Sequence, residues 1–504
     1  MKKILINDSP WQVRIAIMRD GDLQNIYYDT HSKHSLERSF FKGMVSKVIP
    51  GIQTAFVDIG QPKAGFLHIS EIDRELAITR MGEQLEEIEV PDIEKVEQKQ
   101  RKDLDIRKIL KEGEPILVQV SKEPVYEKGA KLTTCFTLPG RFLVLMPNIP
   151  RIGISKKIEE KEERQRLREL VQGNLPEGMG AIIRTSCEHK PEYEILRDLT
   201  YLVDIWNLVL QRYQNATPEE MLYEDIDVVL QVIRDNLDND VDVVLCDTLE
   251  MQQRVHNFVG RIAPEYGSKI VRYDEKTNIF ERFNLEKQIE QALCKKVFLK
   301  SGGSIIVETT EAMAVIDVNT GRYVGQGNLE DTIFKTNLEA AEEIVRQLRL
   351  RNIGGLIVID FIDMASSGNR QKLFKFLERT LKERDKFQSV VLRVSEFGLV
   401  QMTRKRSGKT LMQQLMDECQ DCHGLGMVKS VQTEAFGVLY AIKNELSTKR
   451  LGSRITVTMH PAVLRYITST EYNTLLDLEK NYSCKIICAT HGKTDITVFS
   501  IESV

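Results

Sequence analysis

The feature that most constrains the fold of this chain is a pair of segments that end in the same tripeptide, Val-Ile-Asp, on either side of a helical stretch. Both segments are rich in β-branched residues, which predicts buried strands. The helix between them is expected to begin near Asn328 and to end before Gly354. Residues 311–363 are therefore predicted to form a strand, a helix and a second strand parallel to the first.

The two tripeptides place one carboxylate at the end of each predicted strand, Asp317 and Asp360. Neighbouring parallel strands lie about 4.8 Å apart, so both carboxylates are expected at one edge of the sheet, where α/β proteins commonly bind ligands. Asn319 follows on the same face and could orient a carboxylate or an attacking water. The pair suits Mg²⁺, which takes one or two carboxylates together with phosphate oxygens and waters. The pattern leaves a second interpretation equally open, in which the aspartates cap helices or shape turns.

The composition is that of a multidomain, soluble chain without an overall positive field. Its 504 residues are enough for about three to five domains. The 70 Lys and Arg residues are balanced by 74 Asp and Glu, so any site for a polyanion must be local. The apolar run at the amino terminus is broken by Asn7 and Asp8, and no stretch approaches the length of a membrane span. We therefore expect a cytoplasmic protein without a membrane anchor, whose eight cysteines stay reduced.

Residues 40–72 have the short alternating apolar runs and the Pro and Gly punctuation of a hairpin-rich β module. A charged stretch near residues 88–108 interrupts this pattern, which resumes before Lys122. In a five-stranded OB-type barrel, exposed Phe56 and Phe66 would stack on bases, and Lys122 would contact phosphate. The default expectation from sequence alone is that both phenylalanines belong to the barrel core and that the lysine is merely solvated.

Two further features suit phosphate groups. After a glycine-punctuated turn, Arg184 and Thr185 place a guanidinium beside a hydroxyl, a pairing that can bind a terminal phosphate. The basic residues 404–406, with Lys409, form the clearest basic cluster and would supply a phosphate track for single-stranded nucleic acid. Both Gly-Lys-Thr triplets of the chain lack the upstream glycine of a phosphate-binding loop, which argues against an ATPase.

Cys419 and Cys422 form a CxxC motif, a turn in which two thiolates can face one metal ion. A structural zinc needs four ligands, which either Cys484 and Cys488 or the same pair from a second copy would complete. The second solution places zinc on the two-fold axis of a homodimer. A redox motif is the alternative, but it normally follows a strand, whereas the sequence before Cys419 is helical. We favour zinc, with Cys484 and Cys488 packed as small apolar side chains.

Long motifs distributed over essentially the whole chain closely resemble the bacterial ribonuclease E/G family. They are SGGSIIVETTEAMAVIDVNTGRYVG, TNLEAAEEIVRQLRLRNIGGLIVIDFIDM, SEFGLVQMTRKR and the CxxC that follows, in the order typical of that family. FKGMVSKVIPGIQTAFVDIGQPKAGFLHISEI is similar to the family's S1 domain, and GMGAIIRTS to its 5′-end sensor. Because the chain stops at Val504, without the long carboxy-terminal region of the larger members, we expect it to be most like the ribonuclease G branch.

The resemblance implies an Mg²⁺-dependent endoribonuclease that cleaves single-stranded AU-rich RNA, is stimulated by a 5′-monophosphate, and acts in rRNA maturation and mRNA decay. It implies that Asp317, Asn319 and Asp360 are catalytic, with both aspartates as Mg²⁺ ligands. The other residues that match functional positions of the family are Arg184 and Thr185 for the 5′-phosphate, Phe56, Phe66 and Lys122 for RNA contacts of the S1 domain, and Cys419 and Cys422 for a zinc ion shared between protomers. The implied assembly is a homodimer, with a homotetramer as a further possibility.

The expected fold is multidomain α/β, with RNase H-like and DNase I-like subdomains, an inserted S1 barrel of the OB type, a 5′ sensor, a zinc link and a small C-terminal α/β domain. The RNase H-like subdomain is expected to combine two separate segments, residues 1–36 and 221–291. The other expected domains are residues 37–125 (S1, with the charged insertion near 88–108), 126–220 (5′ sensor), 292–414 (DNase I-like, catalytic), 415–428 (zinc link) and 429–504 (small dimerisation domain).

The chain departs from the family's pattern in the insertion near 88–108, at Gln420 where a proline is usual, and at Ser186 and Cys187 beside the sensor pair. These departures bear on RNA grip, on the zinc turn and on 5′-end preference. With two acids in the motif, one catalytic Mg²⁺ is expected rather than two. The rival hypothesis is a non-catalytic S1-type RNA-binding protein, which predicts binding without turnover.

Overall fold

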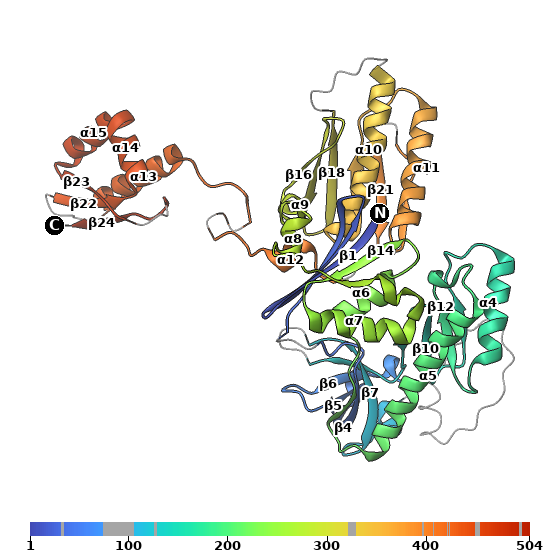
Figure 1. Cartoon of the computed structure of the whole chain (residues 1–504). Coiled ribbons are helices and arrows are strands. Elements are labelled where there is room, and N and C mark those ends of the chain that lie inside the picture. Colours follow the sequence, from blue (N-terminus) through green and yellow to red (C-terminus); the bar gives the residue numbers. More distant parts are fainter. Residues whose placement is uncertain are drawn as a thin grey trace. The chain divides into compact units, whose positions relative to one another are not determined.

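The chain divides into two compact units, Met1–Gly408 and Lys409–Val504, each described by itself below (Figure 1). The computed structural model describes residues 1–31, 35–73, 105–124, 129–320, 329–395, 398–406, 408–420, 422, 424–448, 454–492 and 496–503. Residues 88–104 of the predicted charged insertion lie outside these ranges. Among the described helices, none is long and apolar enough to cross a membrane.

The amino terminus and a distant segment share one five-stranded sheet of order β15-β14-β1-β2-β3. Its strands are β1 (Lys2–Ser9), β2 (Gln12–Arg19), β3 (Asp22–Asp29), β14 (Val241–Cys246) and β15 (Ile270–Arg272). Strand β1 pairs parallel to β14, so segments far apart in the sequence become neighbours. Apolar side chains of α6 (Val228–Asn236) and α7 (Leu249–Ile262) pack with those of β1 and β2 in one core. The short helices α8 (Ile279–Arg282) and α9 (Leu285–Leu293) follow.

Five strands close into a barrel, which confirms the predicted closed β module. They are β4 (Phe40–Ile49), β5 (Thr54–Asp58), β6 (Gly65–His68), β7 (Pro115–Lys122) and β8 (Lys131–Thr133), in the order β4-β5-β6-β8-β7 with β7 returning to β4. The alternate residues Val45, Val57, Leu67 and Val118 fill its interior, as expected for strands with one buried face. The short helix α3 (Ile106–Ile109) contributes to the same core. Strand β8 lies past residue 125, where the predicted S1 domain ends.

A third layer combines a four-stranded sheet with two helices. The sheet has the order β11-β12-β10-β9, built from β9 (Leu138–Pro139), β10 (Leu143–Met146), β11 (Ile152–Ile154) and β12 (Gly180–Ile183). Helices α4 (Lys161–Asn174) and α5 (Glu192–Asn215) pack on it through Leu167, Val171, Ile195 and Trp206. Strand β13 (Glu220–Tyr223) then pairs with β4 and joins this layer to the barrel.

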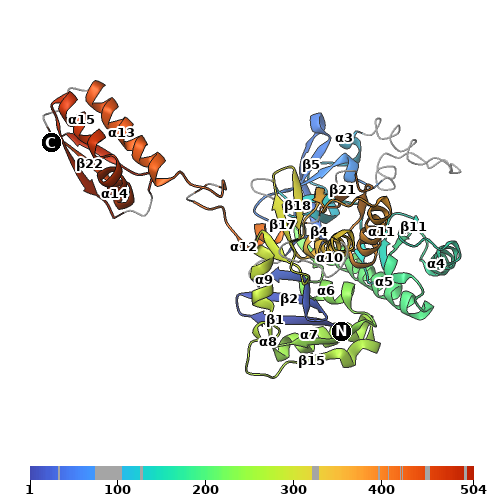
Figure 2. The same ribbon diagram turned by 90° about the horizontal axis from the view of Figure 1, so that it is seen from above.

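The largest sheet contains the two segments that end in Val-Ile-Asp. Its order is β16-β17-β18-β19-β21-β20, from β16 (Lys296–Phe298), β17 (Ser304–Thr309), β18 (Met313–Asn319), β19 (Gly355–Asp360), β20 (Ser389–Val391) and β21 (Leu399–Arg404). Strands β18 and β19 are parallel and joined through α10 (Leu329–Leu350), which confirms the predicted strand, helix and strand. Helix α11 (Ser367–Arg384) lies beside α10 in both views (Figure 1, Figure 2). Both helices pack on one face of the sheet in a single core.

The second unit, Lys409–Val504, contains a small α/β domain. Its sheet has the order β23-β22-β24, from β22 (Arg454–Met459), β23 (Lys485–Thr490) and β24 (Ser500–Ser503). The helices α13 (Val431–Thr448), α14 (Pro461–Thr470) and α15 (Tyr472–Tyr482) pack against the sheet through a continuous apolar core. Helix α12 (Leu411–Leu415) opens the unit, before the CxxC motif.

Candidate active site and nucleic-acid contacts

The two strand-end aspartates lie directly opposite each other. Asp317 and Asp360 are paired positions of the parallel strands β18 and β19. Their neighbours Ile316 and Ile359 are fully buried under the helices, so the alternation of a strand turns both carboxylates to the opposite, open face of the sheet. Asn319 lies on the same face, and its Nδ2 donates to Oδ2 of Asp317 over 2.7 Å. The structure thus brings together the three residues predicted from the motif.

In the part of the chain that the structure describes, the charges that act on Asp360 are negative ones. The pKa of Asp360 is raised by partial desolvation and, in addition, by the charges of Asp317 and Asp363. A cation between the carboxylates would remove this repulsion. Two carboxylates, with water and phosphate oxygens completing the coordination, fit a hard divalent ion such as Mg²⁺. No group of three or more potential protein ligands is found within the described ranges, so substrate and water would supply the remaining positions.

A buried amide holds the segment that follows Asp360. Asn337 on α10 is fully buried; its Nδ2 donates to the carbonyl of Ile362 over 2.8 Å, and its Oδ1 accepts from the backbone N–H of Ile362 over 3.1 Å. Both backbone groups of that residue are therefore paired with one side chain. This two-point contact fixes the end of β19 against the helix, and sequence reasoning missed it because an asparagine inside a helix has no distinctive pattern.

The predicted RNA contacts of the barrel form one row across its outer surface. Register pairs Lys47 with Phe56, Phe56 with Phe66, Phe66 with Lys131, and Lys131 with Lys122. The row crosses the neighbouring strands β4, β5, β6, β8 and β7. Two adjacent aromatic rings flanked by ammonium groups form a platform on which bases can stack beside a phosphate track. Of these ammonium groups, that of Lys131 is paired with the carboxylate of Glu71.

The exposure of this row shows that its rings are outside the barrel. Phe56 and Phe66 are half-buried, whereas the alternate residues Ala55, Val57 and Leu67 are fully buried. The default expectation that the two phenylalanines belong to the core is therefore wrong, because the strand alternation that sends Val57 inward sends them outward. Lys47 and Lys131 were missed; the alternation of their strands was the signal that could have found them.

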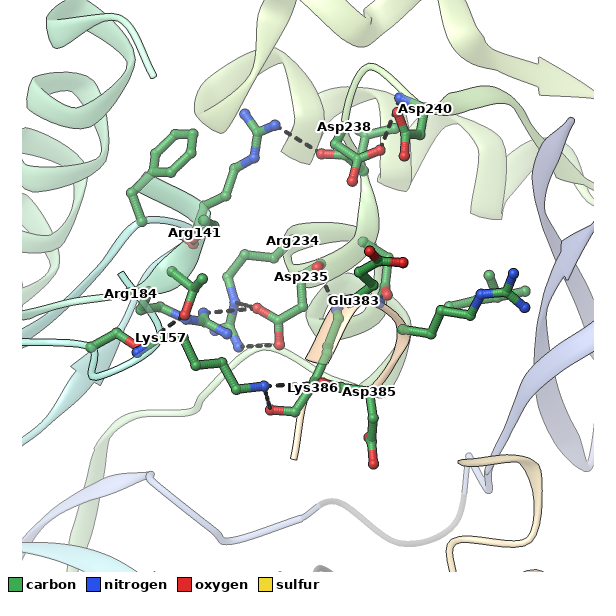
Figure 3. Close-up of a pocket in the computed structure, with 18 of the residues that line it drawn as sticks. Arg141, Lys157, Arg184, Arg234, Asp235, Asp238, Asp240, Glu383, Asp385 and Lys386 are labelled. Atoms are coloured by element: carbon green, nitrogen blue, oxygen red, sulfur yellow. Dashed lines mark hydrogen bonds and ion pairs between the residues drawn. The ribbon is translucent and has the colours of Figure 1, made fainter. Parts of the chain in front are cut away.

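The predicted phosphate-binding pair lies in a cavity of about 820 Å³, within the size range of ligand sites. Arg184 and Thr185 lie directly after β12. The cavity is also lined by Lys2 of β1, Lys157 from the segment after β11, Asp235 of α6 and Lys386 from the loop after α11 (Figure 3). The hydroxyls of Thr185 and Ser155 are 2.9 Å apart. Sequence reasoning missed Lys157, Asp235 and Lys386, since they come from distant segments and carry no local motif.

The two unusual residues after this pair are turned to the backbone of the segment that leads into β10. Ser186 Oγ donates to the carbonyl of Arg141 over 2.7 Å, and Cys187 Sγ lies 3.1 Å from the carbonyl of Phe142. Burial raises the pKa of Cys187 to about 12, so its thiol is neutral at physiological pH. Both side chains therefore support the turn that presents Arg184.

One member of the predicted basic cluster, Arg404, does not belong to a phosphate track, whereas Lys405, Arg406 and Lys409 are exposed. Arg404 is 3% exposed, because it follows Val400 and Met402 on the inward-facing positions of β21. Its Nε donates to Oδ2 of Asp385 over 2.6 Å, and its Nη1 to the carbonyl of Ile353 over 2.7 Å. The prediction was wrong for Arg404, which is a structural ion-pair residue.

In the second unit, the two cysteines of the CxxC motif differ from the later pair. Cys419 is exposed and Cys422 is partly exposed, and the backbone N–H of Gly426 donates to Sγ of Cys422 over 3.3 Å. Cys484 is buried in the apolar core and Cys488 packs against it. Burial raises the pKa of both, which confirms that they pack as small apolar side chains.

Comparisons with known proteins agree with this architecture. The model of the ribonuclease E/G family matches residues 137–407, and that of the RNase E/G thioredoxin-like domain matches residues 418–504. Ribonuclease G of Escherichia coli (strain K12) is 39% identical over 483 residues, which cover 95% of this chain and 94% of that protein. Ribonuclease G of Haemophilus influenzae is 38% identical over 94% of this chain and 93% of that protein. Ribonuclease E of Haemophilus influenzae is 32% identical over 99% of this chain but 52% of that protein. This chain belongs to the ribonuclease E/G family.

Proposed function

We propose that this chain is an Mg²⁺-dependent endoribonuclease that cleaves single-stranded, AU-rich RNA and is stimulated by a 5′-monophosphate. The observation that carries the proposal is the in-register pair Asp317 and Asp360 on the open face of the large sheet. Membership of the ribonuclease E/G family supports endoribonuclease chemistry. Roles in rRNA maturation and mRNA decay are included in the same proposal and rest on the family resemblance.

The residues described above would have different roles in the proposed hydrolysis. Asp317 and Asp360 would hold Mg²⁺, which when bound polarises the scissile phosphate and lowers the pKa of a coordinated water. Asn319 would hold the carboxylate of Asp317 in one orientation through the bond seen here. Asn337 would act as a positioning residue, because it fixes the segment that follows Asp360. The barrel row with Phe56 and Phe66 would hold the single strand by stacking.

The test of this function is cleavage of an end-labelled, AU-rich single-stranded RNA with a 5′-monophosphate. We expect internal cuts with Mg²⁺, none with EDTA, and little cleavage of the same sequence in a duplex, whose bases cannot stack on the barrel row. Binding without cuts under all conditions would favour the rival RNA-binding protein. Cleavage in EDTA would refute the metal-dependent mechanism.

Arg184→Ala is expected to remove the preference for 5′-monophosphorylated over 5′-hydroxyl RNA, because it deletes the guanidinium that would grip the terminal phosphate. The ratio of kcat/KM for the two ends should fall to about one, a loss of roughly tenfold or more for one charge-assisted contact. Arg151→Ala is a matched control at an exposed arginine of the same layer and should retain the ratio. An unchanged ratio in the Arg184 variant would exclude this role.

We also infer a homodimer in which Cys419 and Cys422 of two copies share one zinc ion, with pairing of dimers into a tetramer as a further step. The exposure of Cys419 and the partial exposure of Cys422 support this, as does the burial of Cys484, which removes that thiol from the competition for the metal. Two pairs related by a two-fold axis supply the four ligands of a structural zinc.

Cys419→Ser is expected to release zinc and to convert the dimer into monomers, since two of four thiolate ligands of the shared site are lost at once. Metal analysis and sedimentation velocity measure the two effects together. Cys294→Ser, at an exposed cysteine of the first unit, should keep both zinc and dimer. A Cys419 variant that remains dimeric with full zinc would contradict the shared site.

A further inference from the structure

Two lysines that line the cavity with Arg184, Lys157 and Lys386, already use most of their donors within the protein. Lys157 Nζ donates to the carbonyls of Asp385 and Lys386 over 3.0 and 3.2 Å. Lys386 Nζ donates to the carbonyl of Asp235 over 2.6 Å and to Oδ1 of Asn236 over 2.8 Å. An ammonium group has three donors, so each lysine has spent two of them on protein oxygens. These two lysines therefore offer a ligand fewer donors than their charge suggests.

Arg184 keeps one edge of its guanidinium for a ligand. In the described ranges of the chain, its two hydrogen bonds both use Nη1, which donates to the carbonyl of Gly140 over 2.5 Å and to Oδ1 of Asp235 over 2.9 Å. The Nε and Nη2 edge remains, in the fork geometry that matches one phosphate. With the Thr185 hydroxyl, this is the donor set for a single phosphate group.

Asp235 places a fixed negative charge on the other side of the same guanidinium. Its carboxylate lies between Arg184 and Arg234, whose Nε donates to Oδ1 over 3.1 Å (Figure 3). Burial alone would raise the pKa of Asp235, but the charges and hydrogen bonds of Arg234 and Arg184 outweigh it and lower the pKa to about 2. Arg234 is itself buried and also donates to the carbonyl of Pro139 over 2.7 Å. The carboxylate is therefore charged at every physiological pH.

We propose that Asp235 is a specificity-determining residue that restricts this pocket to RNA ends with one terminal phosphate; the proposal rests on the 5′-end recognition proposed above. A monophosphate brings about two negative charges, and each further phosphate adds at least one more next to the carboxylate. The cavity of about 820 Å³ is much larger than a phosphate group, so charge rather than space sets the limit. Asp235 also acts as a positioning residue, because it orients Arg184 through Nη1.

The test uses the full-length protein and one RNA sequence with four different ends: 5′-hydroxyl, monophosphate, diphosphate and triphosphate. For wild type, kcat/KM should be highest for the monophosphate and fall at the second phosphate. Asp235→Asn keeps an acceptor for Arg184 but removes the charge, so it should raise the triphosphate to monophosphate ratio about tenfold, the effect of one nearby unit charge in a partly shielded site. Asp235→Ala also removes the acceptor and should instead lower stimulation by the monophosphate.

Asp240→Asn is the matched control, since Asp240 lines the same cavity but pairs with Arg19 and is largely exposed. It should leave the triphosphate to monophosphate ratio within about twofold of wild type, because an exposed charge is screened. Equal shifts in the Asp235 and Asp240 variants, or no shift in Asp235→Asn, would overturn the proposal. The proposal would also be overturned if the wild-type protein cleaved the three phosphorylated RNAs equally well and faster than 5′-hydroxyl RNA. This outcome can be measured with the wild-type protein alone. Equal cleavage of all four ends by wild type would instead refute 5′-end recognition itself.

Discussion

Asp317→Asn is expected to lower kcat for RNA cleavage by about a thousandfold or more, because a neutral amide cannot hold the Mg²⁺ that we propose to stabilise charge on the scissile phosphate. Asp360→Asn should have a similar effect, since the two carboxylates are paired positions of neighbouring strands. RNA binding should persist within about twofold, because the barrel row is built from other residues. Single-turnover cleavage and an equilibrium binding assay on the same RNA separate the two quantities.

A neighbouring carboxylate on the same sheet provides the control for this experiment. Glu308 lies on β17, on the same face as Asp317, and pairs with Lys295 over 3.1 Å. Glu308 is exposed, and the residue opposite it on the neighbouring strand is Val315 rather than an acid. Glu308→Gln should therefore retain kcat within about twofold. Cleavage by both aspartate variants at the wild-type rate would move the catalytic centre elsewhere in the chain.

Arg404→Met is expected to destabilise the first unit by about 3–5 kcal/mol, because it leaves the carboxylate of Asp385 buried without its partner. The pair is almost fully buried, with side chains 1% and 2% exposed, and is joined by two bonds of 2.6 and 3.1 Å. Denaturant unfolding monitored by circular dichroism measures the change as a lower midpoint at constant slope. No loss of activity per folded molecule is expected, since the pair faces away from the open side of the sheet.

Two further variants distinguish the ion pair from general packing at this position. Lys405→Met, at the exposed next residue, should change the free energy of unfolding by no more than about 0.5 kcal/mol. Replacing both partners, as Arg404→Met with Asp385→Leu, should recover some of the lost stability, because no charge is then left buried alone. A single Arg404→Met variant as stable as wild type would show that the carboxylate finds water or another partner.

The central β–α–β unit could be predicted because each step depends on residues close in sequence. The apolar runs around Asp317 and Asp360 are long enough to be buried strands, and the helix between them forces a parallel pairing. Each aspartate directly follows the apolar residues of its strand, so parallel pairing of the two strands places the carboxylates side by side, as the register shows. The closed barrel was predictable for a related reason, since alternation and turn residues are local signals.

The role of charged residues could not be predicted in the same way. A run of basic residues that includes Arg404 is normally a solvated surface, and its partner Asp385 lies 19 positions away. Asp235 reads as an ordinary acid near the end of a helix, yet its partner Arg184 lies 51 positions away, and Lys386, which binds its carbonyl, lies 151 positions away. Whether a charge is paired or solvated depends on which segments the fold brings beside it.

The sequence by itself determined the β–α–β unit, the paired aspartates, the five-stranded barrel and the family, because periodicity and motif order are properties of the chain alone. Only the tertiary structure decided that Phe56 and Phe66 share one outer row with Lys131, that Arg404 is a buried structural residue, and that Asp235 faces Arg184. The physical reason is that burial and ion pairing are set by contacts between distant segments. The neighbours of a charged or aromatic side chain therefore decide whether it stabilises the fold or is available to bind the substrate.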